Sequence, residues 1–124
     1  MTELLYGEVT EKIRQAAFEV HKYSGNGFLE KVYENSLVYK LGKIGFSVKQ
    51  QEPIKVYFEN TVAVGDYFAD LIVDHKIIIE LKTVHSLDKV HFAQLKNYLK
   101  ATKFRLGLLI NFGAKELQFK RVIL

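Results

Sequence analysis

The sequence predicts an α/β fold in which helices cover both faces of a mixed β-sheet. Apolar residues recur at helical spacing over residues 8–23, 29–43 and 86–102. Between and after these segments, apolar residues alternate with polar ones or run together, as strands do, over 46–58, 67–73, 77–84, 105–112 and 115–124. Two leading helices, a block of strands, one helix and two more strands give an α/β sandwich, not a doubly wound nucleotide-binding fold.

The first two helices have clear ends. Residues 24–27, Ser-Gly-Asn-Gly, should end the first helix, because Gly and Asn tolerate positive φ. Gly42 and Gly45 should end the second. We expect this second helix to bury one stripe of side chains: Leu29, Val32, Tyr33, Ser36, Leu37 and Leu41.

The strands differ in their expected burial. Residues 46–50 and 54–58 alternate apolar and polar side chains, which is typical of two half-buried strands on either side of Pro53. Residues 67–73 and 77–84 are apolar on both faces, which indicates central strands covered on both sides. Ser86 is the expected N-cap of the helix over 86–102. The segment 115–124 is the expected edge strand.

Size and composition favour a single soluble domain over residues 1–124. The chain is 48% hydrophobic, enough for one compact core, and its lack of cysteine excludes disulfides, thiolate metal sites and cysteine nucleophiles. The N-terminus does not resemble a signal peptide, and no apolar run approaches the length of a membrane span. We therefore expect a cytoplasmic protein that does not bind membranes.

Charge is distributed unevenly along the chain. Residues 1–74 hold eight Lys/Arg and eleven Asp/Glu, whereas residues 75–124 hold ten and three. An anionic partner for the second half would explain this asymmetry, with nucleic acid as the first candidate. A basic surface that is simply solvated is the alternative.

The segment Ile-Ile-Ile-Glu-Leu-Lys at 77–82 places two charges inside a buried strand. Glu80 and Lys82 share a face because side chains alternate along a strand. If residues 70–80 form a hairpin centred on His75, Asp70 lies directly opposite Glu80. Two facing carboxylates repel each other unless a proton or a cation lies between them, and Mg²⁺ prefers such oxygen ligands. The alternative is a structural ion triad in which Lys82 neutralises both carboxylates.

These residues resemble the PD-(D/E)XK nuclease superfamily, whose restriction-endonuclease-like core runs αβββαβ. More narrowly, residues 27–33, GFLEKVY, are similar to the motif of the GxxExxY family through Gly27, Glu30 and Tyr33. Residues 69–82, 91–100 and 106–113 are similar to other blocks of that family. Ala69 precedes Asp70 in place of the proline in the superfamily name.

The resemblance implies a role for each matching residue. Asp70, Glu80 and Glu30 would hold Mg²⁺, for which Mn²⁺ can substitute, and the Leu81 carbonyl could be a further ligand. Lys82 would be the catalytic lysine, and Gln94 the polar residue that faces the site from the following helix. For Glu30 alone, stabilisation by the helix dipole is an alternative explanation of its position.

The expected function is therefore Mg²⁺-dependent hydrolysis of phosphodiester bonds, with DNA as the first candidate substrate. Five basic residues would steer the phosphate backbone: Lys89, Lys96, Lys100, Lys103 and Arg105. Small nucleases of this type often use two subunits, so a homodimer is compatible with the resemblance. The alternative is a catalytically inactive module that keeps the nuclease fold and binds nucleic acid or a protein partner.

Overall fold

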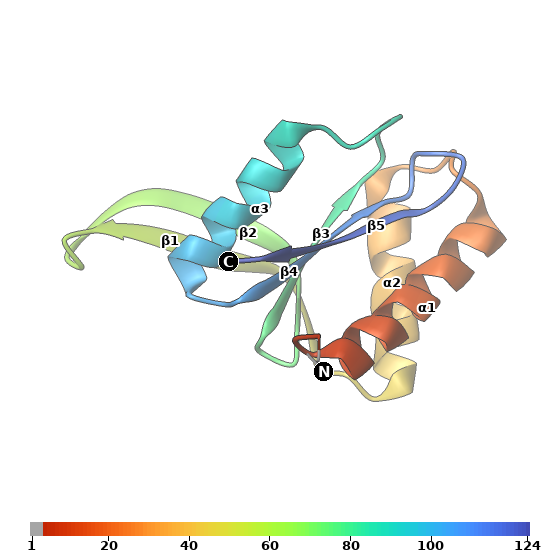
Figure 1. The fold of residues 1–124 in the computed structure, drawn as a ribbon, viewed down its shortest axis with the longest axis horizontal. Helices are drawn as coiled ribbons and strands as arrows, with labels where there is room; N and C mark the ends of the chain where they lie inside the picture. The colour runs from red at the N-terminus through yellow and green to blue at the C-terminus, as the bar shows by residue number, and fades with distance from the viewer. Residues whose placement is uncertain (1–3) are drawn as a thin grey trace.

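The computed structural model describes residues 4–124, which form helices on both sides of a five-stranded sheet (Figure 1). The strands lie in the order β1 (Val48–Phe58), β2 (Val62–Val73), β3 (Ile77–Lys82), β4 (Leu106–Asn111) and β5 (Gln118–Ile123). β3 and β4 pair in parallel, and all other neighbours pair antiparallel. The predicted mixed α/β sandwich is confirmed.

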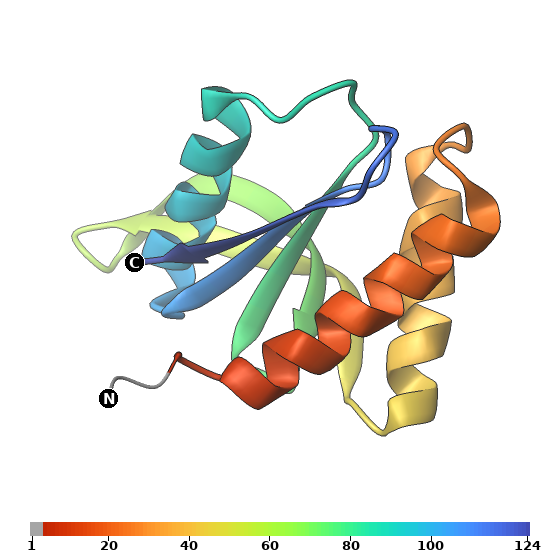
Figure 2. The same ribbon diagram turned by 45° about the vertical axis from the view of Figure 1, so that its right-hand side comes forward.

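Three helices complete the layers. α1 (Gly7–Ser24) and α2 (Glu30–Ile44) lie side by side on one face, while α3 (Lys89–Thr102) lies on the other and connects the parallel strands (Figure 2). The turn at residues 24–27 separates α1 from α2, as predicted. Within residues 4–124, no helix is long and apolar enough to cross a membrane.

Each face of the sheet has its own apolar core. On the α1–α2 face, Ile13, Tyr33 and Leu37 are fully buried against the sheet. On the other face, Leu95 and Leu99 of α3 pack with residues of β3 and β4. A Cβ atom at position 107 would lie 2.7 Å from the Leu95 side chain, so Gly107 allows α3 to pack this closely on β4.

The buried stripe of α2 is narrower than predicted. Tyr33, Leu37 and Leu41 are fully buried, but Leu29 is 82% and Val32 40% exposed. Leu29 is the N-cap residue with extended backbone, so its side chain does not continue the helical stripe. The stripe also contains Glu34, a buried carboxylate that the apolar pattern did not predict.

Two element boundaries also differ from the predictions. Residues 48–58 form one long strand where two were predicted, because Pro53 sits within β1 at the sheet edge, where a missing N–H donor is tolerated. Asp88, not Ser86, is the N-cap of α3, and it forms a capping box with His91. The side chain of Asp88 accepts a hydrogen bond from the Lys89 amide, and the ring of His91 accepts one from the Asp88 amide.

The outer halves of β1 and β2 project from the sheet as a two-stranded arm, defined here as residues 54–68 (Figure 1). β2 pairs with β3 only through residues 71–73, so the arm has no third strand. At the base of the arm, the side-chain alternation of β1 is broken. Gln50 contacts α2 whereas Ile54 packs against α3, although both are even-numbered, and Gln51 between them has φ 50°. Even-numbered side chains of β1 therefore point toward α2 before Gln51 and toward α3 after it.

Candidate active site

The site lies where β2 separates from β3. Leu71, Ile72 and Val73 pair with Ile79, Ile78 and Ile77, so the predicted register centred on His75 is confirmed. Continued by one residue, this register places Asp70 opposite Glu80. The two carboxylates therefore meet at the last position before the strands diverge.

The two carboxylates replace the backbone ladder at this point. The Asp70 amide donates a hydrogen bond of 2.7 Å to Glu80 Oε2, and the Leu81 amide donates one of 2.9 Å to Asp70 Oδ2. Each side chain thus satisfies a backbone N–H of the opposite strand. This exchange fixes both carboxylates between the strands, where Glu80 is 4% exposed and Asp70 is half-buried.

Burial perturbs the protonation of all three predicted ligand carboxylates. Burial, followed by the charge of Asp70, raises the pKa of Glu80 to about 8. The pKa of Asp70 is raised by burial despite the opposing hydrogen bonds from Leu81 and Gln51. Burial also raises the pKa of Glu30, with the charge of Asp70 as the next contribution. At neutral pH Glu80 therefore carries a proton, and this proton removes the repulsion between the two carboxylates, as a bound cation would.

The positive charge of Lys82 partly offsets the rise in the pKa of all three carboxylates. Within residues 4–124, no ion pair joins Lys82 to Asp70, Glu80 or Glu30. Its Nζ donates a hydrogen bond of 3.3 Å to Gln94 Oε1, and Gln94 Nε2 donates one of 3.1 Å to the Tyr98 hydroxyl. Lys82 and Gln94 are thus brought together, as predicted, and the ammonium is held beside the carboxylates without pairing to them.

Two residues of the site were missed by the sequence reasoning. Glu34 is 2% exposed and accepts hydrogen bonds from Gln50, Gln51 and Lys31 at 2.9 to 3.0 Å. Gln51 Nε2 also donates to Asp70 Oδ1 at 3.3 Å, so it joins the two acidic residues. The sequence spacing could have indicated Glu34, because it lies one helical turn after Glu30 and on the same face of the helix.

The residues present suit a hard divalent ion in chemistry, though their side chains are not gathered around one point. All candidate side-chain donors are carboxylate oxygens, which Mg²⁺ and Mn²⁺ prefer. Across the described residues 4–124, however, no three Asp, Glu or His side chains are close enough to hold an ion together. Glu80 Oε2 and Asp70 Oδ2 each accept a hydrogen bond from a backbone N–H.

A sequence comparison with protein families identifies the family of this chain. Residues 7–122 match the sequence profile of the family described as the PD-(D/E)XK nuclease superfamily. The chain belongs to this superfamily.

A second comparison supports the fold of this superfamily member. The crystal structure of SSO0001 superposes with a TM-score of 0.59 at 19% sequence identity, covering 95% of this chain. The chain spans 59% of the length of SSO0001. No curated protein matches the sequence significantly.

Tyr33 organises the approach to Glu30 in this superfamily member. Its ring is fully buried and stacks on Phe112 with centroids 4.7 Å apart. Its hydroxyl donates to the Gly25 carbonyl at 2.6 Å and accepts from the Phe28 amide at 3.1 Å. The loop that leads into α2 is therefore tied to the helix one turn beyond Glu30, which fixes where Glu30 begins the helix.

The loop from β3 to α3 is held by a second buried network. Asn111 donates to the Val84 carbonyl at 2.9 Å and accepts from the Val84 amide at 3.0 Å. At Gly113 a Cβ atom would lie 2.4 Å from the backbone carbon of Thr83, so only glycine permits this contact. The loop is thereby fixed between Lys82, at the end of β3, and α3, which carries Gln94.

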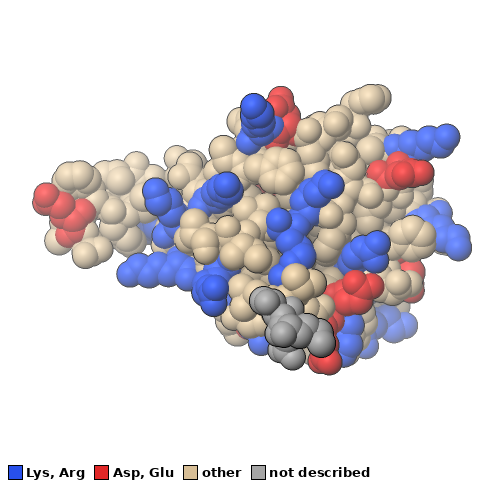
Figure 3. Space-filling view, in the orientation of Figure 1, with Lys and Arg blue, Asp and Glu red and all other residues tan. Residues whose placement is uncertain are grey.

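The five predicted basic residues are all exposed. Figure 3 shows Lys and Arg side chains spread over α3 and the strands beside it. Lys100 and Lys103 line a hollow between α3 and the arm. Lys89, Lys96 and Arg105 are exposed elsewhere and do not line that hollow.

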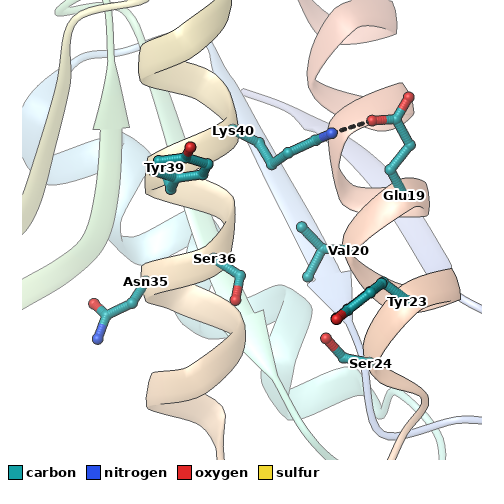
Figure 4. A pocket seen from close by; sticks show the side chains of 8 residues that line it. All are labelled: Glu19, Val20, Tyr23, Ser24, Asn35, Ser36, Tyr39 and Lys40. Carbon is teal, nitrogen blue, oxygen red and sulfur yellow. Dashed lines mark ion pairs between the residues drawn. The ribbon is translucent and has the colours of Figure 1, made fainter.

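A hollow of about 620 Å³ between α1 and α2 is separate from the candidate site (Figure 4). Its lining includes Tyr23, Tyr39 and an ion pair between Lys40 and Glu19 that joins the two helices. None of the predicted catalytic residues contributes to it.

Proposed function

We propose that this protein is a divalent-metal-dependent nuclease that hydrolyses phosphodiester bonds, with DNA as the first candidate substrate. The assignment to the GxxExxY family is part of the proposal, as is a single nuclease-like domain spanning residues 1–124. The superfamily match supports the reaction class, because its members are nucleases. The metal would be Mg²⁺, with Mn²⁺ able to replace it.

One observation carries the proposal. Asp70 and Glu80 face each other in a buried gap, and the nearest lysine, Lys82, hydrogen-bonds Gln94 instead of pairing with either carboxylate. A structural ion triad would place the ammonium between the carboxylates, because an unpaired buried charge is costly. The arrangement leaves a position for a cation other than Lys82.

Each residue would have a distinct role. Asp70 and Glu80, helped by Glu30 and by the Leu81 carbonyl, would hold the metal. When bound, the ion would supply Lewis-acid stabilisation of the phosphate and lower the pKa of a bound water. Lys82 would lie beside the phosphate and stabilise the negative charge that builds on its oxygens during hydrolysis.

The remaining residues would keep Lys82 and the carboxylates in position. Gln94 accepts from the Lys82 ammonium and is itself oriented by Tyr98. Gln51 holds Asp70 through its amide and ties it to Glu34. In the reaction, a water molecule gives up one proton as its oxygen bonds to phosphorus, the ester P–O bond breaks, and the leaving oxygen takes up one proton, so that each cleavage consumes one water molecule. Basic residues on and after α3 would attract the phosphate backbone.

Cleavage of a mixed panel tests the proposal. Wild-type protein with Mg²⁺ or Mn²⁺ should cut at least one of single-stranded DNA, duplex DNA, branched DNA and RNA. Lys82→Ala and Glu80→Ala should lower that rate by at least about 100-fold, whereas Lys12→Ala on α1 should not change it. No cleavage by the wild type, or equal cleavage by Lys82→Ala, would favour the inactive binding module instead.

A further inference from the structure

A continuous groove runs from the candidate site along the arm. A hollow of about 500 Å³ lies between the arm and α3, with Val56, Val64 and Tyr67 on one side and Val90, Asn97 and Tyr98 on the other. A second hollow of about 570 Å³ shares Val56 and Asn97 with the first and is lined by Lys55, Lys100 and Lys103. We call the two together the arm–α3 groove.

The groove begins beside the candidate active site. Gln94, which accepts the hydrogen bond from Lys82 Nζ, also lines the first hollow. Tyr98, to which Gln94 donates, lines it too, and the Tyr67 ring lies 5.8 Å from the Tyr98 ring. A ligand in this hollow would therefore be adjacent to the phosphate that Lys82 is proposed to contact.

The walls of the first hollow combine accessible apolar side chains with the polar groups of His91, Gln94 and Asn97. Val64 is 62% and Val90 63% exposed, and Tyr67 is 48% exposed. Side chains of this kind gain free energy from contact with an apolar or aromatic surface. Phosphate groups offer no such surface, whereas the faces of unstacked bases do.

The second hollow is basic. Lys55 lies on β1, Lys100 on α3 and Lys103 at the C-cap of α3. Among the described residues that line either hollow, none is Asp or Glu. Lys55 has Asp66 as its cross-strand neighbour on β2, so Lys100 and Lys103 make the stronger site for phosphates, and Asn97 lies at the junction with the first hollow.

We infer that the arm–α3 groove binds an unpaired nucleic-acid strand, with a base against the exposed side chains of Tyr67, Val64 and Val90 and the backbone phosphates along Lys55, Lys100 and Lys103. This inference rests on the proposed function and specifies its substrate class. A duplex does not fit the same features, because its bases are stacked inside and only phosphates and groove edges reach the protein. An unpaired strand supplies both the aromatic faces and the charges that the groove accepts.

Binding without cleavage tests this inference separately from catalysis. Fluorescence anisotropy in EDTA would compare a labelled single-stranded DNA, the same sequence as RNA, and the blunt DNA duplex. The wild type should bind one of the single strands at least about 10-fold tighter than the duplex. A duplex bound equally or more tightly would overturn the inference, even if the duplex were cleaved with Mn²⁺.

Matched lysine variants locate the bound strand. Replacing Lys55, Lys100 and Lys103 together by Gln should weaken single-strand binding by about 10-fold or more and reduce the slope of log affinity against log salt by about 2. Replacing Lys12, Lys22 and Lys43 by Gln removes the same charge from α1 and α2 and should cost less than about 3-fold. Equal losses in the two triple variants would overturn the inference.

Two further variants test the base position. Val64→Gln with Val90→Gln removes apolar surface at exposed positions, so the fold should be kept while single-strand affinity falls by about 3-fold or more. Ile123→Gln, at a 50% exposed position on β5, should leave affinity unchanged. If the Val64 and Val90 variant instead alters the oligomeric mass in size-exclusion chromatography and leaves affinity unchanged, the groove contacts a second copy and the inference is overturned.

The outcomes separate the two proposals. Tight single-strand binding in EDTA without any cleavage in Mn²⁺ would support the groove assignment and contradict the nuclease proposal. Cleavage with no preference for binding unpaired strands would support the nuclease proposal and contradict the groove assignment.

Discussion

Asp70 and Glu80 each satisfy a backbone N–H on the other's strand: the Asp70 amide donates to Glu80 Oε2 at 2.7 Å, and the Leu81 amide donates to Asp70 Oδ2 at 2.9 Å. The carboxylates thus take the place of backbone acceptors where β2 leaves β3. Within residues 4–124, neither carboxyl group forms an ion pair with a lysine. The exchange also makes their protonation part of the stability of the fold.

The metal-free protein should lose stability as pH rises. Burial and the charge of Asp70 raise the pKa of Glu80 from 4.5 to about 8 in the folded state. Between these values the folded chain keeps a proton that the unfolded chain has released, so the free energy of unfolding falls by up to about 1.4 kcal/mol per pH unit. Urea unfolding in EDTA between pH 5 and pH 9 measures this slope.

Glu80→Gln is the matched variant for this pH dependence. Glutamine stays neutral and can still accept from the Asp70 amide, so its unfolding free energy should vary less with pH and exceed that of the wild type near pH 9. Glu8→Gln, at an exposed position on α1, should keep the wild-type slope. Equal slopes for wild type and Glu80→Gln would show that Glu80 is not the group responsible.

Tyr33→Phe should destabilise the protein by about 1–3 kcal/mol, because the Phe28 amide and the Gly25 carbonyl both lose their partner at a buried hydroxyl. The ring contact with Phe112 is retained, so the global fold should survive. Nuclease activity should fall further than stability explains, since the loop before Glu30 loses its tie. Tyr39→Phe, at a 64% exposed position, is the control and should change neither quantity.

Gly113→Ala should be among the most damaging single substitutions. The new Cβ would lie 2.4 to 2.6 Å from backbone atoms of Thr83 and Val84, which cannot move without breaking the Asn111 network. We expect a loss of at least about 3 kcal/mol, measured by thermal or urea unfolding.

Gly42→Ala provides the opposite expectation within the same chain. Position 42 lies inside α2, and no atom lies within 4 Å of the added methyl group. Alanine should therefore stabilise the protein by about 0.5–1 kcal/mol through helix propensity. A Gly113→Ala variant as stable as Gly42→Ala would contradict the described packing of the β3–α3 loop.

The register of β2 against β3 was predictable from the short connection between the two strands. Residues 71–73 and 77–79 are apolar on both faces, so burial alone does not select a register, but a hairpin centred on His75 brings Asp70 to Glu80, and the structure has that register. The apolar pattern failed for part of α2. Leu29 and Val32 fit the apolar stripe but are exposed, because the helix begins only at Glu30 and turns its buried face toward Glu34.

The residues that could not be predicted are polar groups buried by tertiary contacts. Glu34 has the appearance of a surface glutamate in a polar helix segment, and only the side chains of Gln50 and Gln51 explain its burial. The positive φ of Gln51 is equally invisible in an alternating strand pattern. The face exchange at the base of the arm follows from that conformation, and with it the arm–α3 groove.

A crystal structure of the wild type grown with Mn²⁺ tests the central claim most directly. Anomalous scattering locates Mn²⁺ independently of the protein atoms. We predict one ion bound by oxygens of both Asp70 and Glu80 at about 2.0–2.3 Å, the range for small divalent ions with oxygen ligands. Crystals of Glu80→Gln should lack it. An empty gap in the wild type, with Glu80 still on the Asp70 amide and Mn²⁺ bound only elsewhere, would contradict the account.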